Sequence, residues 1–62
     1  MNTKDTKALN ALKREYPLAR LIAFEDGLYN VYVGDEYYEE VYSYSLKDGK
    51  LVYVGVLVID AA

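Results

Sequence analysis

The chain has 62 residues, a formal net charge of −3, no cysteine and no histidine. We expect a single domain over residues 1–62, because this length forms one core and leaves little room for a pocket that encloses a substrate. The lack of cysteine excludes disulfides and thiolate metal sites, and the lack of histidine removes the commonest metal ligand and general base. The composition therefore predicts a protein that is not an enzyme and that needs no cofactor.

The N-terminal segment has the periodicity of an amphipathic helix over about residues 4–15. Its apolar stripe consists of Ala8, Leu9, Leu12 and Tyr16. Thr3 or Asp5 can cap the start of this helix, and Pro17 cannot continue it. The cations that lie largely off the stripe form a basic helix face, which consists of Lys4, Lys7, Lys13 and Arg14.

After Pro17 the sequence alternates as strands do, and we expect strands over about residues 18–25, 28–33, 36–46 and 51–60. Asp26-Gly27 and Asp48-Gly49 each lie between apolar runs, which is the strongest short-range signal for a hairpin. Gly34-Asp35 offers a third turn. The sequence thus predicts an α+β fold, α-β-β-β-β, with one N-terminal helix packed on a four-stranded antiparallel β-meander.

Two-residue turns at these three places fix a register that can be tested. They put Phe24 opposite Tyr29, Val31 opposite Tyr38, and Tyr42 opposite Gly55. The apolar face that results consists of Ile22, Phe24, Tyr29, Val31, Val33, Tyr38, Tyr42, Tyr44, Leu46, Leu51, Tyr53, Leu57 and Ile59. Glu40 falls on this face against the pattern, and a bulge near Glu39-Glu40 would relieve that conflict. The residues that we expect to be largely buried are Leu9, Leu12, Ile22, Phe24, Val31, Leu51 and Leu57.

The opposite face is also apolar along the last strand, although a solvated antiparallel face normally alternates with polar residues. We expect it to be a self-association face that consists of Leu21, Tyr32, Val41, Val52, Val54, Val56 and Val58. Burial within the monomer and an exposed patch are the other two interpretations. One helix cannot cover both faces, and large exposed patches are rare, so the pattern favours a homodimer.

A second candidate surface is an acidic aromatic contact patch, which consists of Asp35, Glu36, Tyr37, Glu39 and Glu40. Its spacing does not match a calcium-binding loop. A solvated turn explains it, and so does contact with a cationic protein surface, since tyrosine is common in binding hot spots.

These patterns favour a non-catalytic protein-interaction module, a homodimer that acts by covering a surface of another, unidentified protein. The first alternative is a small regulator of nucleic-acid transactions, which acts through the basic helix face or by acidic mimicry. The acidic, tyrosine-rich sheet would repel phosphate, and −3 is a small charge for mimicry. The second alternative is a ligand-free structural or engineered scaffold.

The start of the chain lacks the pattern of a signal peptide, and the longest apolar run, residues 51–59, is shorter than the roughly 18 residues of a membrane span. We therefore expect a cytoplasmic protein without membrane contact. The scarcity of thermolabile residue types beside abundant charge follows a thermophile trend.

Overall fold

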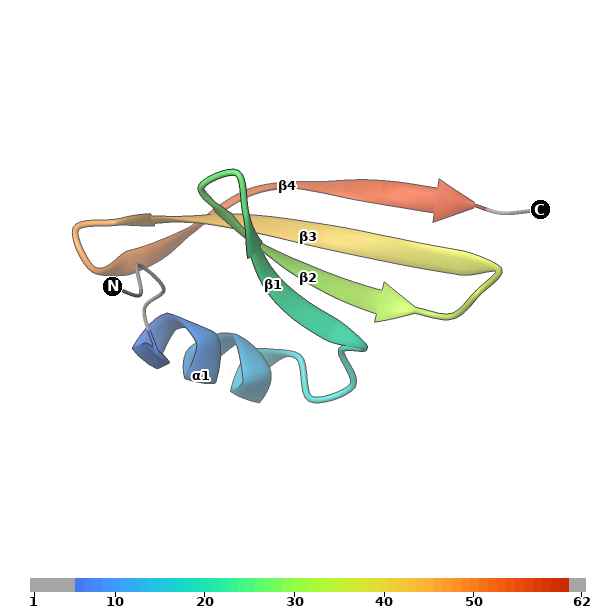
Figure 1. The fold of residues 1–62 in the computed structure, drawn as a ribbon, viewed down its shortest axis with the longest axis horizontal. Coiled ribbons are helices and arrows are strands. Elements are labelled where there is room, and N and C mark those ends of the chain that lie inside the picture. The colour runs from blue at the N-terminus through green and yellow to red at the C-terminus, as the bar shows by residue number, and fades with distance from the viewer. Residues whose placement is uncertain (1–5, 61–62) are drawn as a thin grey trace.

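The computed structural model describes residues 6–60 and contains one helix followed by four antiparallel strands in a single sheet. The elements are α1 (Thr6–Glu15), β1 (Leu21–Glu25), β2 (Leu28–Gly34), β3 (Tyr38–Lys47) and β4 (Lys50–Asp60), and the strands lie in the order β1-β2-β3-β4 (Figure 1). The predicted α-β-β-β-β meander is confirmed. Thr3, Lys4 and Asp5, which the sequence assigns to the start of the helix, lie outside the described residues.

The helix packs on one face of the sheet, which we call the helix face; the other is the helix-free face. Ala8 and Leu12 of α1 are buried against Tyr29 and Val31 of β2. Leu12 and Val31 are thus in the core as predicted. The other predicted core residues that pack against this cluster are only half-buried, and they are Leu9, Ile22, Phe24 and Leu51.

The two Asp-Gly turns form as predicted. Asp26 and Gly27 have φ angles of 52° and 80°, and Asp48 and Gly49 have 52° and 77°. Positive φ at both central residues is the geometry of a type I′ turn, which suits the twist of a two-residue hairpin. Phe24 therefore lies opposite Tyr29 in the predicted register.

The third turn is longer than predicted, because Val31 lies opposite Tyr42 and not opposite Tyr38. The Asp35 carboxylate accepts the backbone N–H groups of Tyr37 at 2.9 Å and of Tyr38 at 3.1 Å, which stabilises a wider loop between β2 and β3. The register moves by an even number of residues, so each side chain of β3 keeps its predicted face.

Strand β4 contains a bulge at Val54. Tyr44 pairs with Tyr53, whereas Ser43 pairs with Gly55, so Val54 has no partner residue in β3. The prediction of a bulge near Glu39-Glu40 is wrong, because the pairing there is regular on both sides.

This bulge reverses the alternation of side chains in the last part of β4. Val56 lies opposite Tyr42 on the helix face, where Gly55 was predicted, and Val58 lies on the same face. Leu57 and Ile59 therefore lie on the helix-free face, opposite to the prediction. The expected burial of Leu57 is also wrong, since 63% of this residue is exposed.

The molecule is elongated, with extents of 38 × 21 × 19 Å. Figure 1 shows α1 beneath one end of the sheet, near the turn between β3 and β4. The start of β3 and the end of β4 extend beyond the helix. The core therefore lies at the helix end, and the other end of the hairpin has no second layer among the described residues.

Candidate interaction surface on strand β4

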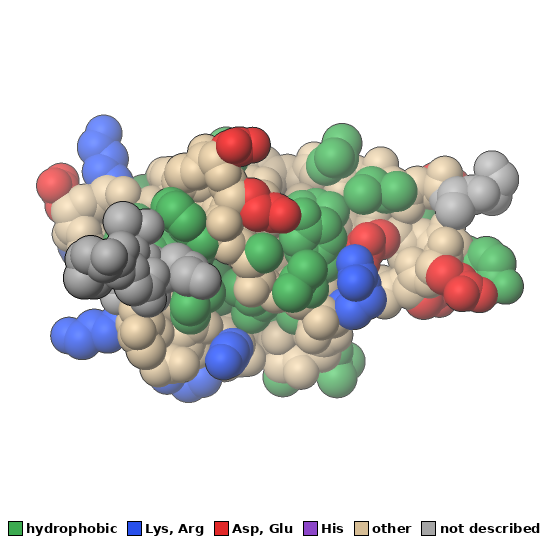
Figure 2. Space-filling model, in the orientation of Figure 1, with side chains coloured by type: hydrophobic (Ala, Val, Ile, Leu, Met, Phe, Trp, Pro, Cys, Tyr) green, Lys and Arg blue, Asp and Glu red, His purple; other side chains and the backbone are tan. Residues whose placement is uncertain are grey.

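Strand β4 forms one edge of the sheet and pairs only with β3 in the described part of the chain. Its large apolar side chains beyond Leu51 are all 44–63% exposed, and they are Val52, Tyr53, Val54, Val56, Leu57, Val58 and Ile59. The only charged residues of β4 are Lys50 and Asp60, at its two ends. Hydrophobic side chains stand out in the upper right of the space-filling view, over the part of β4 that leads to its C-terminal end (Figure 2).

The residues of the predicted self-association face do not share one face. Val56 and Val58 lie on the helix face, while Val52 lies on the helix-free face and Val54 is in the bulge. This correction follows from the bulge, which changes the period-two pattern within the strand.

The remaining members of that set come from three strands of the helix-free face. Leu21, Tyr32 and Val41 lie in one row across β1, β2 and β3. Val41 is only 6% exposed, so it is already buried within the monomer, and Tyr32 is half-buried. The exposed apolar surface thus follows the β4 edge and does not cover one whole face of the sheet.

The centre of the helix-free face is polar and hydrogen-bonded. The Glu25 carboxylate accepts hydrogen bonds from Asn30 Nδ2 at 2.9 Å and from the Tyr32 hydroxyl at 2.7 Å. The Ser43 hydroxyl donates to Asn30 Oδ1 at 2.7 Å. The bonds from Asn30 and then Tyr32 lower the pKa of Glu25 below its ordinary value. This network makes the middle of that face unsuitable for dry packing against a second sheet.

The acidic aromatic contact patch is divided between the loop and the two faces. Asp35 binds backbone groups of its own loop, as described above, and Glu36 and Tyr37 are exposed beside it. Glu39 lies on the helix-free face, where its carboxylate pairs with Arg20 Nε at 2.7 Å. Asp35, Glu36 and Glu39 line one surface hollow, whereas Glu40 lies on the helix face, so the structure brings together only part of the predicted patch.

Glu40 lies on the helix face and is satisfied there without a bulge. Its carboxylate accepts the hydroxyl groups of Tyr42 and Tyr38. These bonds, with Tyr42 the larger contributor, lower the pKa of Glu40 below its ordinary value. The conflict seen in the sequence pattern is resolved by side-chain hydrogen bonds.

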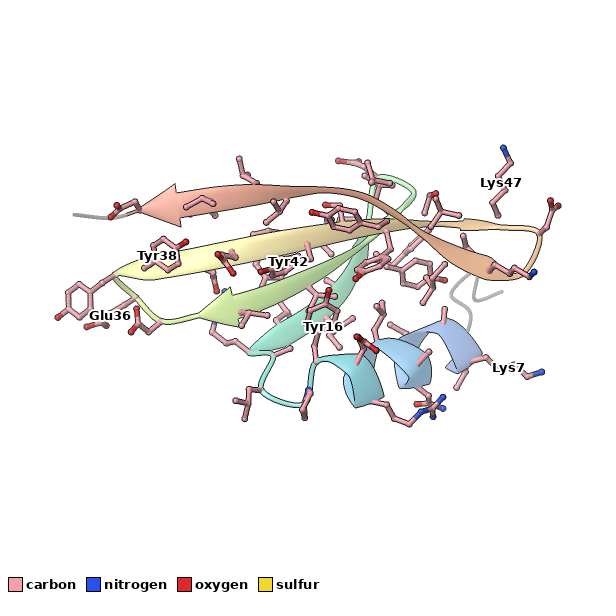
Figure 3. The ribbon with its side chains drawn as sticks, turned by 180° about the vertical axis from the view of Figure 1, so that it is seen from behind. Lys7, Tyr16, Glu36, Tyr38, Tyr42 and Lys47 are labelled. Atoms are coloured by element: carbon pink, nitrogen blue, oxygen red, sulfur yellow. The ribbon has the colours of Figure 1, made fainter. Side chains whose placement is uncertain are left out.

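A cluster of tyrosines connects the helix to β3 and β4. The ring of Tyr16 lies 5.4 Å from that of Tyr42 and 6.2 Å from that of Tyr44, and the Tyr44 ring lies 5.6 Å from that of Tyr53. Tyr16 and Tyr44 also share a hydrogen bond between their hydroxyl groups. Burial, followed by this bond, raises the pKa of Tyr16. Figure 3 shows Tyr16 facing Tyr42, with Tyr38 farther along β3 beyond the helix.

The basic helix face is exposed at Lys7, Lys13 and Arg14, whereas Lys4 lies outside the described residues. Lys13 and Arg14 are in the last turn of α1, where cations interact favourably with the helix dipole. The helix dipole therefore explains the two cations at these positions without a bound ligand.

A surface hollow of about 300 Å³ lies beside Arg20, Glu39 and Ile59. Asp35 and Glu36 also line it. Arg20 and Glu39 are paired with one another, and the Asp35 carboxylate binds backbone groups of its own loop. Among residues 6–60 there is no group of three or more acidic side chains placed to hold a metal ion.

Sequence reasoning missed Leu57 and Ile59 as members of the exposed β4 surface. The signal that could have found them is Gly55, because a glycine inside a strand often marks a bulge.

In the described part of the chain, no helix has the length and apolar character to cross a membrane. Comparison with models of protein families, with curated proteins and with solved structures finds no match for this sequence.

Proposed function

We propose that this protein is a non-catalytic protein-interaction module that acts as a homodimer and covers a surface of another protein. The observation that carries the proposal is the β4 edge, where apolar side chains are exposed on both faces of an outer strand. An exposed, long and apolar edge strand is a ready template for pairing with another chain.

Edge strands of monomers are normally protected by charges, proline, a short length or a covering element. Between Lys50 and Asp60, β4 contains no charge and no proline, and at 11 residues it is the longest strand of the sheet. The other edge, β1, is only 5 residues long and begins beside the ion pair of Arg20 with Glu39. The two edges therefore differ in the way expected when one of them is a contact surface.

A second copy of the chain is the partner that best fits this edge. A two-fold interface needs a patch that is complementary to itself, and an uncharged apolar strand meets this condition by antiparallel pairing. Packing of helix-free faces is less favourable, because it would bury the hydrogen-bonded centre formed by Glu25, Asn30 and Ser43.

The test compares one charge on each edge of the sheet. Leu57 on β4 and Leu21 on β1 are exposed on the helix-free face, at 63% and 45%, so Leu57→Lys and Leu21→Lys make the same substitution at positions that are both open to solvent in the monomer. Light scattering of the parent, over roughly micromolar to millimolar concentrations, should show a mass that rises to that of a dimer. Leu57→Lys should remain a folded monomer, because pairing of the β4 edges would place its charge among apolar side chains of the partner and near the same charge of the second copy, and Leu21→Lys should behave like the parent.

A parent that stays monomeric over this range contradicts the proposal, as does a dimer that Leu21→Lys disrupts as strongly as Leu57→Lys. Circular dichroism of each variant establishes that the fold is retained. Affinity capture with the parent and with Leu57→Lys then shows whether the dimer is the form that binds another protein.

A further inference from the structure

The turn of the β3–β4 hairpin fixes which residues direct their backbone N–H and C=O groups toward the opposite strand. Lys47 and Lys50 flank the two-residue turn, so they exchange backbone hydrogen bonds. Bonded and non-bonded pairs alternate along an antiparallel ladder. Ser45 and Val52 therefore form a bonded pair, and the odd-numbered residues of β3 direct their backbone groups toward β4.

The other side of β3 agrees with this assignment. The backbone N–H of Asp35 donates to the carbonyl oxygen of Tyr38 at 2.9 Å, so the backbone groups of Tyr38 are directed toward β2. Because these directions alternate along the strand, the backbone groups of Glu40 and Tyr42 are also directed toward β2. Glu39 and Val41 therefore direct their backbone groups toward β4.

These directions identify the outward backbone groups of β4 after the bulge. Glu39 and Val41 pair with Ile59 and Leu57, so the backbone groups of Ile59 and Leu57 are used by β3. The residues between and after them direct their N–H and C=O groups away from β3, and they are Val56, Val58 and Asp60.

We infer that residues 56–60 of β4 pair antiparallel with the same segment of a second copy, with the two Val58 residues opposite one another. This inference rests on the proposed homodimer and specifies its contact. Two four-stranded sheets then become one continuous sheet of eight strands. The two-fold axis is perpendicular to that sheet, so both helices lie on the same side.

The outward groups favour this register over its nearest competitor. With Val58 at the axis, Val58 bonds to the partner's Val58, and Val56 bonds to the partner's Asp60 on each side of the axis. With Leu57 at the axis, only Val56 and Val58 exchange bonds before the bulge at Val54 interrupts the ladder. The Val58 register therefore forms three bonded pairs, and the Leu57 register forms two.

Side-chain packing favours the same register. With Val58 at the axis, Leu57 lies opposite the partner's Ile59 in a non-bonded pair, where side chains approach most closely. Both residues are exposed on the helix-free face of the monomer. With Leu57 at the axis, Ile59 would instead lie opposite the partner's Gly55, which has no side chain to contact.

The contact is short and therefore weak. Five residues at about 3.4 Å each span roughly 17 Å, which is small for a specific interface. We expect a dimer that forms in the micromolar to millimolar range and exchanges rapidly with the monomer.

The absence of cysteine from the chain permits a direct test with single-cysteine variants. In the inferred register the two Val58 Cα atoms lie about 5.5 Å apart, which is within the range of a disulfide. The two Leu57 residues are then diagonal neighbours at about 7–8 Å, which is too far. Val58→Cys should therefore form a covalent dimer under mild oxidation at least tenfold faster than Leu57→Cys. Val52→Cys, exposed on the same strand before the bulge, is the matched control for random collision and should be as slow.

A faster reaction of Leu57→Cys than of Val58→Cys overturns the register. Equal, slow reaction of all three variants, while the parent is a dimer by light scattering, overturns the β4 pairing and leaves the proposed homodimer intact. A parent that is monomeric throughout overturns both.

Amide hydrogen exchange of the unmodified protein gives a second readout. Exchange at Val56 and Val58 should slow at least severalfold as the protein concentration rises. Exchange at Leu57 and Ile59, whose amides already bond to β3, should change less. Equal slowing at all four amides contradicts the pairing.

Discussion

Truncation of Leu12 tests whether the helix is an integral part of the fold. Leu12 is 2% exposed and lies in the core with Ala8, Tyr29 and Val31. A buried Leu→Ala change removes favourable burial and leaves a cavity, which together cost about 2–5 kcal/mol. At about 0.05–0.15 kcal/mol per residue, a chain of 62 residues has a total stability of roughly 3–9 kcal/mol. Leu12→Ala should therefore remove a large part of this stability.

Urea denaturation followed by circular dichroism measures this loss. The protein concentration must be the same for every variant, because dimer formation adds to the apparent stability. With a slope of about 1 kcal/mol per molar urea, the midpoint should fall by roughly 2–5 M, or the variant should be unfolded without urea. Leu18→Ala, at a residue that is 87% exposed, should shift the midpoint by less than about 0.5 M. If Leu12→Ala and Leu18→Ala have the same urea midpoint, the helix is not docked as described.

Two further substitutions test the loop and the carboxylate on the helix face. Gly34→Ala should destabilise by more than about 1 kcal/mol, because φ is 138° and a Cβ would lie 2.3 Å from the Tyr38 carbonyl oxygen, whereas Gly55→Ala has open space and should be nearly neutral in the same urea experiment. The folded state lowers the pKa of Glu40 below its ordinary 4.5, so its stabilising contribution is complete above that pH and is lost as the pH falls through the folded-state pKa. Between about pH 7 and pH 3 the melting temperature should therefore fall less for Glu40→Gln than for the parent. An equal fall would show that the bonds from Tyr42 and Tyr38 are not made.

Local sequence signals predicted the elements of this fold well, because each depends on neighbouring residues. Pro17 ends the helix, and the Asp-Gly pairs fix two turns through their positive φ angles. The loop after Gly34 was predicted too short, since its geometry depends on the Asp35 side chain accepting two backbone N–H groups. The sequence permits this interaction, but the sequence pattern does not show that it forms.

The candidate surface was predicted in part, and the error has one physical cause. Strand β4 was correctly identified as apolar on both sides, but strict alternation placed Val56 and Val58 on the wrong face. A single unpaired residue reverses every side chain that follows it. The period alone does not contain this information, because either strand of a pair can take up the extra residue. The one sequence signal for the bulge is Gly55, a glycine inside the strand.

The bulge also decides which kind of interface the strand can form. Without it, the residues from Val52 to Val58 that lie on even-numbered positions would align on the helix-free face, and that face would suit stacking against a second sheet. With it, the four apolar residues after Gly55 divide equally, since Val56 and Val58 lie on one face and Leu57 and Ile59 on the other. The apolar surface is then centred on the edge, where a second strand contacts both pairs of side chains and bonds to the outward backbone groups between them. One extra residue in β4 thus converts a surface suited to face packing into one suited to extending the sheet.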